Sequence, residues 1–442
     1  MQRLFDLEKL LKDAIPEHML KRGLIVLNAN LRPVKLLFEQ RRVPEEGWDD
    51  DVIDLLLTLL SLMDTDKDPD SARIGEREAR VSSPLVSKLA HGFGHGIGRS
   101  GNIAAPQPKA AGGSLMSYFT NKLALDMLRR SGAPNLNSVC VVPLATGMAV
   151  GLAASVAREM TKGKEVVYPR CDIKSPIKGI QLVGMEVKTV EGQVSGDAVR
   201  VPVGDISEAI TDETAAIVST TTFFPPREPD EVKAIARIAD ERGIPHIINN
   251  AYGVQSREIM GMVRGAIDAG RVDAVIQSTD KNFLTPVGGA LIASPDPGYA
   301  EKVSRMYAGR ATAAPLVQLL ASLLSMGTSG YERLRDEQEE NRRFLEVSLG
   351  ELAERHGERI LDVYNPIAVA MTLNNFEAKR VGHYIYVLRV TGPRVLEGGD
   401  YGTCCEAYPN PYITMNAAIG ASGKDVELAM EKLEKALTQS KK

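Results

Sequence analysis

The stretch IPHIINNAYGVQSREI at residues 244–259, followed by VDAVIQSTDKNFLTPVGGALIAS at residues 272–294, decides the fold of this chain. Each segment begins with a short apolar run that suits a strand buried on both faces of a parallel sheet. Polar residues follow each run, with Asn249 after the first and Lys281 after the second. Ligands of open α/β sheets collect at the carboxyl ends of the strands, so we expect both side chains to lie where a ligand binds.

The alternation of strand, turn and helix continues on the amino-terminal side of this stretch. Apolar runs that suit strands occur in SVCVVPLATG (138–147), EVVYPR (165–170) and AAIVSTTTFF (215–224). Helical spacing of apolar residues follows the first run in MAVGLAASVAREM (148–160), and EVKAIARIADERG (231–243) is a clear amphipathic helix. This alternation predicts an α/β fold, with a mostly parallel sheet that carries helices on both faces.

The segments outside this region differ in character. Residues 1–70 place apolar residues at three- and four-residue intervals, which predicts a helical N-terminal extension. Residues 71–310 form the predicted large α/β domain, and their first part, 71–113, is a loop rich in glycine and arginine. A loop of this length without regular structure is usually functional or disordered, and its recurrent arginines favour a functional role.

Residues 311–442 predict a second, smaller α+β domain. A long helical pattern runs from Pro315 to about Gly357, and short strands are expected at AVAMTL (368–373) and YIYVLRV (384–390). A closing helix is expected at DVELAMEKLEKAL (425–437).

Composition excludes several classes of protein. The chain has 442 residues, 44% hydrophobic and 25% charged, which is ordinary for a soluble protein. A formal charge of −4 gives no global argument for RNA binding, so any RNA contact must be a local patch. No apolar run approaches the ~18 residues that a membrane span needs. The four cysteines, without a metal-binding spacing, suit a reducing cytoplasm and predict no metal site.

The loop GIGRSG, residues 96–101, matches the glycine spacing of a dinucleotide-binding fingerprint. That fingerprint needs a buried strand before it and a helix after it, whereas two prolines follow here where the helix should start. We therefore interpret the loop as a nest of backbone N–H groups beside Arg99, which suits a phosphate.

Two elements resemble those of pyridoxal-phosphate enzymes with the aspartate aminotransferase fold, fold type I. Ser278-Thr-Asp-Lys281 is similar to their Schiff-base lysine motif, and Asn249 stands where a side chain faces the pyridine nitrogen. Only an amine forms an imine that exchanges with a substrate amine, which explains the lysine. Taken alone, Lys281 would more often be a solvated surface residue. The turn Ala145, Thr146, Gly147 and Met148 is a candidate cup for the cofactor phosphate at a helix N-terminus.

A wider resemblance covers most of the chain, in order, from LLFEQRRVPEEGW (36–48) to YITMNAAIG (412–420). Within it, several motifs closely resemble the O-phosphoseryl-tRNA(Sec) selenium transferase family. These motifs are GEREARV (75–81), HGIGRSGNIAAPQPKAAGGS (95–114), NNAYGVQS (249–256), STDKNFLTPVGGA (278–290) and YAGRATAAP (307–315).

The resemblance implies roles for individual residues around the cofactor and the substrate. Lys281 would carry pyridoxal phosphate, Asn249 would face its ring nitrogen, and Arg77 would contact its phosphate across a subunit interface. The active unit would then be at least a dimer, and the family forms homotetramers. The phosphate of the substrate would be held by Arg99, Ser100, Gln107 and Arg310. Two guanidinium groups suit a phosphate dianion that departs as a leaving group.

Three further roles follow from the same resemblance. Glu76 would be a filter that repels the α-carboxylate of free phosphoserine, because the tRNA ester carries no such charge. The RNA would be contacted by Arg41, Arg42 and Arg394. The match is looser there, since Pro393 stands where the family has alanine. Ile173 likewise replaces a family glutamine, so it cannot make that side chain's hydrogen bonds.

The implied reaction converts O-phosphoseryl-tRNA(Sec) to selenocysteinyl-tRNA(Sec), with selenophosphate as the selenium donor. Two alternatives within enzymes are another pyridoxal-phosphate lyase or decarboxylase and a sulfur-using phosphoseryl-tRNA enzyme. The phosphate-holding set disfavours a decarboxylase, which has no such phosphate to bind. A non-catalytic tRNA-binding protein on the same fold is a third alternative, and Lys281 argues against it.

Overall fold

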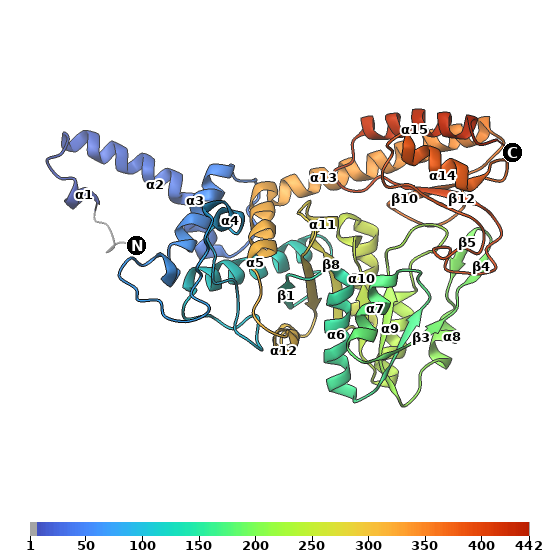
Figure 1. Cartoon of the computed structure of the whole chain (residues 1–442), viewed down its shortest axis with the longest axis horizontal. Coiled ribbons are helices and arrows are strands. Elements are labelled where there is room, and N and C mark those ends of the chain that lie inside the picture. Colours follow the sequence, from blue (N-terminus) through green and yellow to red (C-terminus); the bar gives the residue numbers. More distant parts are fainter. Residues whose placement is uncertain (1–6, 442) are drawn as a thin grey trace.

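The computed structural model describes residues 7–441, and its centre is a seven-stranded sheet (Figure 1). The strand order is β1-β9-β8-β7-β6-β2-β3. Strand β9 pairs antiparallel with β1 and β8, whereas the remaining pairs are parallel. The strands are β1 (Ser138–Val142), β2 (Glu165–Pro169), β3 (Glu186–Val190), β6 (Thr214–Thr220), β7 (His246–Asn249), β8 (Ala274–Ser278) and β9 (Ala290–Ser294). The predicted mostly parallel sheet is confirmed.

Helices cover both faces of this sheet. Every residue of β1, β6, β7, β8 and β9 is buried, and successive side chains of a strand point to opposite faces. The surrounding helices are α5 (Ala111–Arg130), α6 (Thr146–Thr161), α7 (Lys174–Leu182), α8 (Val203–Glu208), α9 (Val232–Arg242), α10 (Arg257–Ala269) and α12 (Tyr299–Met306). Burial on both faces explains why these strands are continuous apolar runs in the sequence. A small hairpin, β4 (Gln193–Ser195) with β5 (Ala198–Arg200), lies beside them.

Helical crossovers bring the polar strand ends to one edge of the sheet. Helix α9 connects β6 to β7, and α10 connects β7 to β8, so the three parallel strands end at the same edge. Asn249 is the last residue of β7, and Lys281 lies in the single-turn helix α11 (Thr279–Asn282) directly after β8.

The long helix α13 (Ala314–Arg355) joins this main body to a C-terminal unit. Its first part packs Leu316, Leu320 and Leu323 into the core of the main sheet. Its second part packs Leu345 and Leu349 into a separate hydrophobic cluster. The helix changes direction at Gly327, whose positive φ of 61° glycine adopts easily.

The C-terminal unit consists of the second part of α13, an antiparallel sheet of order β10-β12-β11, and helices α14 and α15. These elements are β10 (Ala368–Thr372), β11 (Arg394–Leu396), β12 (Tyr412–Asn416), α14 (Ala378–Val387) and α15 (Gly423–Thr438). The predicted strand at AVAMTL and the closing helix are both confirmed.

The strand predicted at residues 384–390 is wrong, because most of that segment is helical and belongs to α14. Its aromatic and β-branched residues resemble a strand, but the buried side chains recur at Ala378, Val381 and Ile385. That spacing is one face of a helix, and Tyr386, 81% exposed, lies on the other. Tertiary burial of one helical face outweighs the local strand preference of these residue types.

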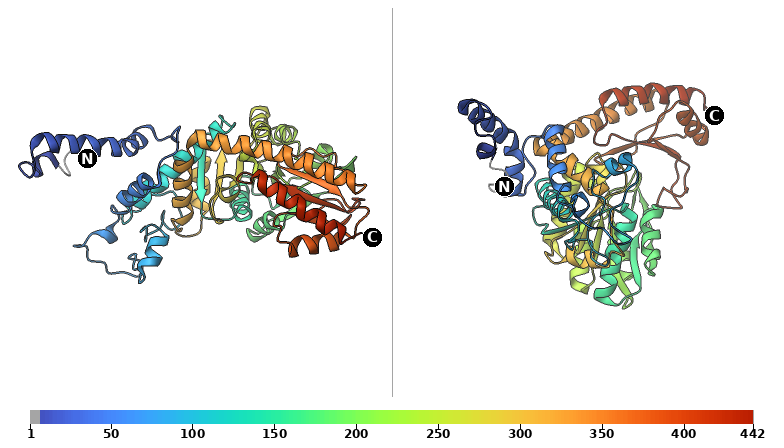
Figure 2. Two further views of the ribbon diagram at one scale, coloured as in Figure 1. Left: turned by 90° about the horizontal axis from the view of Figure 1, so that it is seen from above. Right: turned by 60° about the vertical axis from the view of Figure 1, so that its left-hand side comes forward.

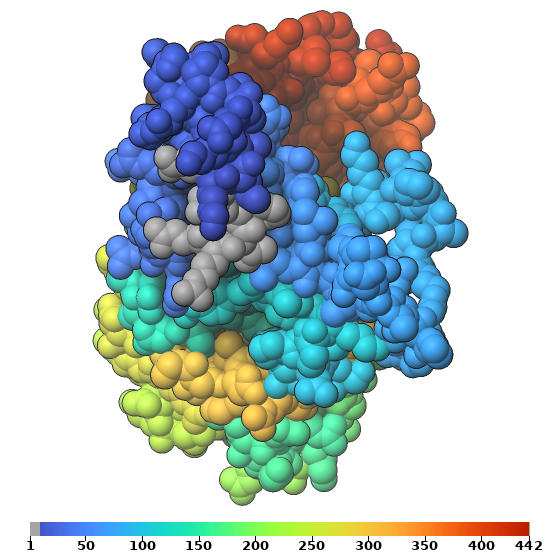
Figure 3. All heavy atoms as spheres, turned by 90° about the vertical axis from the view of Figure 1, so that its left-hand side faces the viewer, coloured from blue at the N-terminus to red at the C-terminus, as the bar shows by residue number. Residues whose placement is uncertain are grey.

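The N-terminal region is helical, as predicted, and extends away from the main body (Figure 2). Its elements are α1 (Leu7–Leu10), α2 (Glu17–Gln40), α3 (Asp50–Ser61), the 3-10 turn η1 (Thr65–Lys67) and α4 (Pro84–Leu89). Only Leu20, Val34 and Leu37 of α2 are buried, and Ile25, Val26 and Leu27 are exposed. In Figure 3, which faces this end of the molecule, the dark blue N-terminal helices lie at the upper left and the light blue segment lies on the right.

Within residues 7–441, no helix has both the length and the apolar character that crossing a membrane requires.

Candidate active site

A cavity of about 510 Å³ opens at the carboxyl ends of the parallel strands. Asn249 and Lys281 both line it, so the structure brings together the two side chains predicted from the strand ends. Part of the wall comes from the C-terminal unit and the segments that border it, namely Ile367, Arg394, Asn416, Ala418 and Ile419. The cavity therefore lies where the main sheet meets the C-terminal unit.

The backbone around Lys281 is firmly held while its amine remains accessible. Asn282 donates from Nδ2 to the carbonyls of Ser278 and Ala251 at 2.7 and 2.9 Å, and Gln255 Nε2 donates to the Lys281 carbonyl at 3.1 Å. The Lys281 side chain is 46% exposed and its Nζ lies 3.6 Å from Asp280 Oδ2. A fixed backbone with an accessible amine is what covalent binding of an aldehyde requires.

Within residues 7–441, four residues of the wall have buried polar atoms without a hydrogen-bond partner. They are Thr146 Oγ1, Thr222 Oγ1, Asn249 Oδ1 and Tyr252 Oη. Buried polar atoms are almost always paired in folded proteins, so a polar ligand is expected among them. A heteroaromatic ring with a phosphate group fits this set. Asn249 would face the ring nitrogen and Thr146, the first residue of α6, would receive the phosphate.

The four predicted residues at the start of α6 contribute unequally to the cavity. Of Ala145, Thr146, Gly147 and Met148, Thr146 lines the cavity, whereas Met148 is 42% exposed. Gly147 is buried, and a Cβ there would lie 2.5 Å from the Ser175 carbonyl oxygen. Glycine is therefore required for the close approach of α6 to the start of α7.

The structure adds wall residues that sequence reasoning did not find. Asp172 follows β2, and Thr222, Phe223 and Phe224 follow β6. The rule that located Asn249 and Lys281, polar or aromatic residues after a buried strand, could have found these positions as well. Ile173, for which a hydrogen bond was not expected, also lines the cavity.

Asp172 anchors a loop of the C-terminal unit. Its Oδ2 accepts hydrogen bonds from the backbone N–H groups of Gly402 and Cys404 at 2.8 and 2.9 Å. Its Oδ1 accepts from Arg170 Nε at 3.0 Å. The two backbone hydrogen bonds tie the loop to the segment that follows β2.

Three of the other predicted residues line a second hollow, of about 570 Å³. Glu76, Arg77 and Arg310 line it together with His95, whereas Lys281 does not. The side chains of Glu76 and Arg77 are 87% and 63% exposed, and Arg77 Nε lies 3.9 Å from Glu76 Oε1. Within one chain, the residues expected to hold phosphate thus lie outside the cavity that contains Lys281.

The glycine-rich loop and the segment around Arg310 are joined by backbone hydrogen bonds. Ile97 N donates to the Ala311 carbonyl at 2.9 Å, and Ala311 N donates to the Ile97 carbonyl at 3.3 Å. Arg310 Nη2 donates to the His95 carbonyl. Arg99, two residues beyond Ile97, is exposed in a tight turn closed by the Asn102 backbone at 2.9 and 3.0 Å. Arg99 and Arg310 are therefore carried by one rigid unit.

Close packing explains the glycines of this loop. Gly96 has a φ of +66°, and a Cβ there would lie 2.2 Å from the Ala311 carbonyl oxygen. Between residue 7 and the loop the structure has no strand, and the next helix, α5, begins only at Ala111. Sequence reasoning against a dinucleotide fingerprint is confirmed.

The 3-10 turn η1, with Asp64 directly before it, supports both ends of this loop. Asp64 Oδ1 accepts from Gly113 N at 3.0 Å, and Lys67 Nζ donates to the Gly92 carbonyl at 2.7 Å. Burial raises the pKa of Asp64. Burial also lowers the pKa of His95, an effect that the nearby Asp66 opposes. Neutral His95 is thus favoured beside the Arg310 guanidinium.

The remaining predicted positions lie on loops. Ser100 is exposed next to Arg99, and Gln107 is half-buried with its backbone N–H donating to Ser114 Oγ at 2.9 Å. No group of three or more His, Cys, Asp or Glu side chains within residues 7–441 could hold a metal ion.

The three arginines expected to contact RNA lie in two places. Arg41 and Arg42 are exposed at the end of α2, where Arg41 Nη1 donates to Tyr118 Oη at 3.0 Å. Arg394 lines the cavity of Lys281, and its guanidinium lies over the rings of Phe224 and Phe223, 4.7 and 5.5 Å from their centroids.

Comparison with known proteins identifies the family. Residues 63–438 match the model of the family described as O-phosphoseryl-tRNA(Sec) selenium transferase, SepSecS. The chain belongs to this family. A curated member from Methanopyrus kandleri is 47% identical over 97% of this chain and 99% of its own length. A more distant member from Dictyostelium discoideum is 34% identical over 91% of this chain and 92% of its own length.

Solved structures agree with this family assignment. The crystal structure of an archaeal O-phosphoseryl-tRNA(Sec) selenium transferase is 44% identical, superposes with a TM-score of 0.93, and covers 96% of this chain and 98% of its own. A glutamate decarboxylase from Lactobacillus brevis, 13% identical with a TM-score of 0.60, covers 89% of this chain and 93% of its own. At that identity the likeness shows the fold alone. The predicted pyridoxal-phosphate fold of type I is confirmed.

Proposed function

We propose that this chain is a pyridoxal-phosphate-dependent transferase that converts O-phosphoseryl-tRNA(Sec) to selenocysteinyl-tRNA(Sec) with selenophosphate. The observation that carries the proposal is the shared cavity of Lys281 and Asn249, whose wall has unpartnered buried polar atoms. Similarity to named selenium transferases over nearly the whole chain supports the same reaction.

Some residues of the cavity are proposed to bind the cofactor, and Lys281 is also proposed to act on the substrate. Lys281 would bind the cofactor covalently, Asn249 would face its ring nitrogen, and Thr146 with the N-terminus of α6 would hold its phosphate. When bound, the cofactor would supply an electron sink for the negative charge that develops at the substrate α-carbon. The amine of Lys281 would remove the α-proton as general base.

Elimination and addition follow at the β-carbon. The C–O bond to the substrate phosphate breaks, and Arg99 and Arg310 stabilise the departing dianion, with Ser100 and Gln107 as further hydrogen-bond partners. Loss of the α-proton and of the phosphate leaves a double bond between the α- and β-carbons. Selenium of selenophosphate then bonds to the β-carbon while the α-carbon takes back a proton, and hydrolysis of the Se–P bond releases the second phosphate. Two phosphates thus leave for each selenocysteine formed.

A second copy of the chain completes the site in this proposal. The hollow with Glu76, Arg77 and Arg310 does not include Lys281 within one chain. In a homo-oligomer, which we propose to be a tetramer, this hollow would face the Lys281 cavity of a neighbouring copy. Arg77 would then contact the cofactor phosphate from across the interface.

The tRNA is proposed to approach along two surfaces. Arg41 and Arg42 lie on the exposed N-terminal region and would contact the RNA backbone electrostatically. Arg394, beside the catalytic cavity, would contact the acceptor end that carries phosphoserine. The charged tRNA is a substrate of translation, and we place the reaction in the cytoplasm.

Turnover of phosphoseryl-tRNA(Sec) with selenophosphate tests the proposal. The purified protein should show visible absorbance from lysine-bound cofactor and should form selenocysteinyl-tRNA, while Lys281→Ala should lose both. Lys302→Ala, an exposed lysine elsewhere, is the matched control. Thiophosphate or sulfide used as efficiently as selenophosphate would instead favour a sulfur-using enzyme, and turnover of free phosphoserine at equal efficiency would favour a general lyase.

A further inference from the structure

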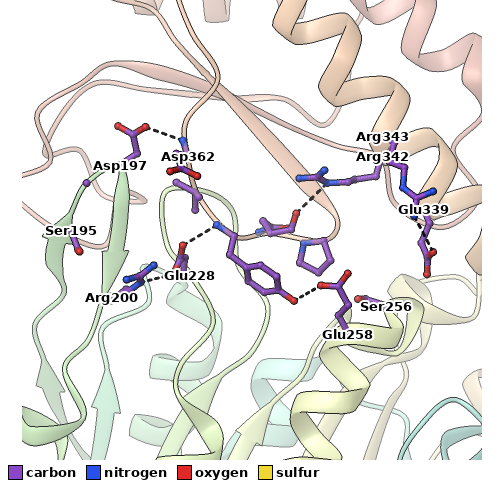
Figure 4. A pocket seen from close by; sticks show the side chains of 15 residues that line it. Ser195, Asp197, Arg200, Glu228, Ser256, Glu258, Glu339, Arg342, Arg343 and Asp362 are labelled. Atoms are coloured by element: carbon purple, nitrogen blue, oxygen red, sulfur yellow. Dashed lines mark hydrogen bonds and ion pairs between the residues drawn. The ribbon is translucent and has the colours of Figure 1, made fainter.

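A groove of about 720 Å³ separates the main body from the C-terminal unit on the side of residues 359–366 (Figure 4). Three carboxylates of the main body, Asp197, Glu228 and Glu258, point toward this segment in Figure 4. Glu228 accepts from Tyr364 N at 2.9 Å, and Glu258 accepts from Tyr364 Oη at 2.5 Å. Burial raises the pKa of Tyr364, so its hydroxyl remains a donor. The segment is thereby docked on the main body.

Asn365, the next residue, also lines the groove, and its side-chain amide contacts residues in the wall of the catalytic cavity. It is 7% exposed, and its Nδ2 donates to the Phe223 carbonyl at 2.7 Å. Its Oδ1 accepts from the backbone N–H groups of Ile367 and Ala368 at 3.0 and 2.8 Å. Phe223 and Ile367 both line the cavity of Lys281. One buried amide therefore links two parts of the wall that come from different parts of the chain.

Phe223 also supports Arg394. The Arg394 guanidinium lies over the rings of Phe223 and Phe224, which the main body supplies, while Arg394 itself belongs to β11 of the C-terminal unit. Stacking of this kind fixes the plane of a guanidinium and leaves its N–H edge available. In the part of the chain that the structure describes, no carboxylate forms an ion pair with Arg394.

We propose that Asn365 is a positioning residue for Arg394. By holding the Phe223 carbonyl, it fixes the aromatic surface on which the guanidinium rests, and so aims the N–H edge of Arg394 at the incoming acceptor end of the tRNA. The inference rests on the proposed function, in which Arg394 contacts RNA. It adds that Asn365 fixes the orientation of the Arg394 guanidinium for this contact. Asparagine suits the position because one side chain must donate to a carbonyl and accept from two N–H groups.

Two variants of Asn365 test the inference. Asn365→Asp keeps the acceptor contacts and removes the donor to Phe223, and Asn365→Ser removes the contact without adding a buried charge. Each should raise KM for phosphoseryl-tRNA(Sec) about fivefold to tenfold, as expected for one lost hydrogen bond, with kcat and cofactor absorbance nearly unchanged. Tyr364→Phe is the matched control, because it removes a docking hydrogen bond that does not involve Phe223. Its KM should stay within about twofold of wild type.

A double-mutant cycle with Arg394→Ala tests whether Asn365 affects KM through Arg394. If Asn365 acts through Arg394, adding Asn365→Ser to Arg394→Ala should change KM no further. An undiminished extra increase in the Arg394→Ala background, or an unchanged KM in both Asn365 variants, would overturn the positioning role while leaving the proposed function intact. If Arg394→Ala alone leaves KM unchanged, the RNA contact of Arg394 fails, and this inference falls with it.

Discussion

At the scale of single residues, we propose that Asn249 sets how strongly the ring of the cofactor can draw electrons. Its Oδ1 is buried and unpartnered in the cavity, and a neutral amide cannot pair with a pyridinium charge. An aspartate would keep the ring nitrogen protonated and would stabilise the substrate carbanion more strongly. Asn249→Asp should therefore give more abortive transamination per turnover, measured as the fraction of cofactor converted to its amine form. An unchanged partition would mean that Asn249 only orients the ring.

Glu76 is the residue proposed to select the esterified substrate. Its carboxylate is 87% exposed in the hollow of Arg77 and Arg310, so it can act on a ligand there. Glu76→Gln removes the repulsion of an α-carboxylate and should raise kcat/KM for free phosphoserine relative to phosphoseryl-tRNA(Sec). The ratio of the two values is the measurement, since a general loss of activity cancels in it. If the ratio stays constant, the filter role is wrong.

Arg310 and Arg99 are expected to serve the substrate phosphate and not the cofactor phosphate. Losing one charge-assisted contact costs about 1.5–3 kcal/mol, so Arg310→Ala and Arg99→Ala should each lower turnover roughly tenfold to a hundredfold. Cofactor absorbance should remain near normal. Arg305→Ala, an exposed arginine on α12 paired with Glu301, is the control. Loss of cofactor in place of loss of turnover would assign these arginines to the other phosphate.

At the scale of elements, the glycine-rich loop is fastened to the segment around Arg310 by backbone hydrogen bonds. A Cβ at Gly96 would lie 2.2 Å from the Ala311 carbonyl, whereas a Cβ at Gly101 would meet nothing within 4 Å, although both have positive φ. Gly101→Ala should cost only backbone strain, about 1 kcal/mol of stability. Gly96→Ala should in addition separate Arg99 from Arg310 and raise KM for the tRNA substrate. Equal effects in both variants, measured by thermal unfolding and kinetics, would argue against a positioning role for this junction.

Predictability also differed between elements. Strands β6, β7 and β8 were predictable because burial on both faces makes them continuous apolar runs between turns. Helix α14 was mistaken for a strand, since Tyr384, Ile385 and Tyr386 are strand-forming types locally. The segment is helical because Ala378, Val381 and Ile385 pack into the hydrophobic cluster of the C-terminal unit. The local sequence does not show which side chains will be buried there.

At the scale of the whole molecule, the proposed site needs two chains, and complementation tests this. Mixing Lys281→Ala with Arg77→Ala chains should restore one intact site for each mixed pair, because each chain supplies what the other lacks. Mixing Lys281→Ala with Asn249→Ala should restore nothing, since both side chains line the same cavity of one chain. Activity is measured after co-refolding or subunit exchange. No recovery in the first mixture would mean that Arg77 acts within its own chain.

The sequence alone determined the sheet, the lysine and the asparagine at its edge, and the glycine-rich loop, because each has a local signature of apolar runs, strand ends or glycine spacing. Only the tertiary structure decided which of these residues meet. It brought Arg394 over Phe223 and Phe224 in the Lys281 cavity, and it gathered Arg77 and Arg310 in a separate hollow. These contacts join segments that are distant in the sequence, for example through α13, which packs into both hydrophobic cores. Packing between distant segments leaves no local pattern in the chain.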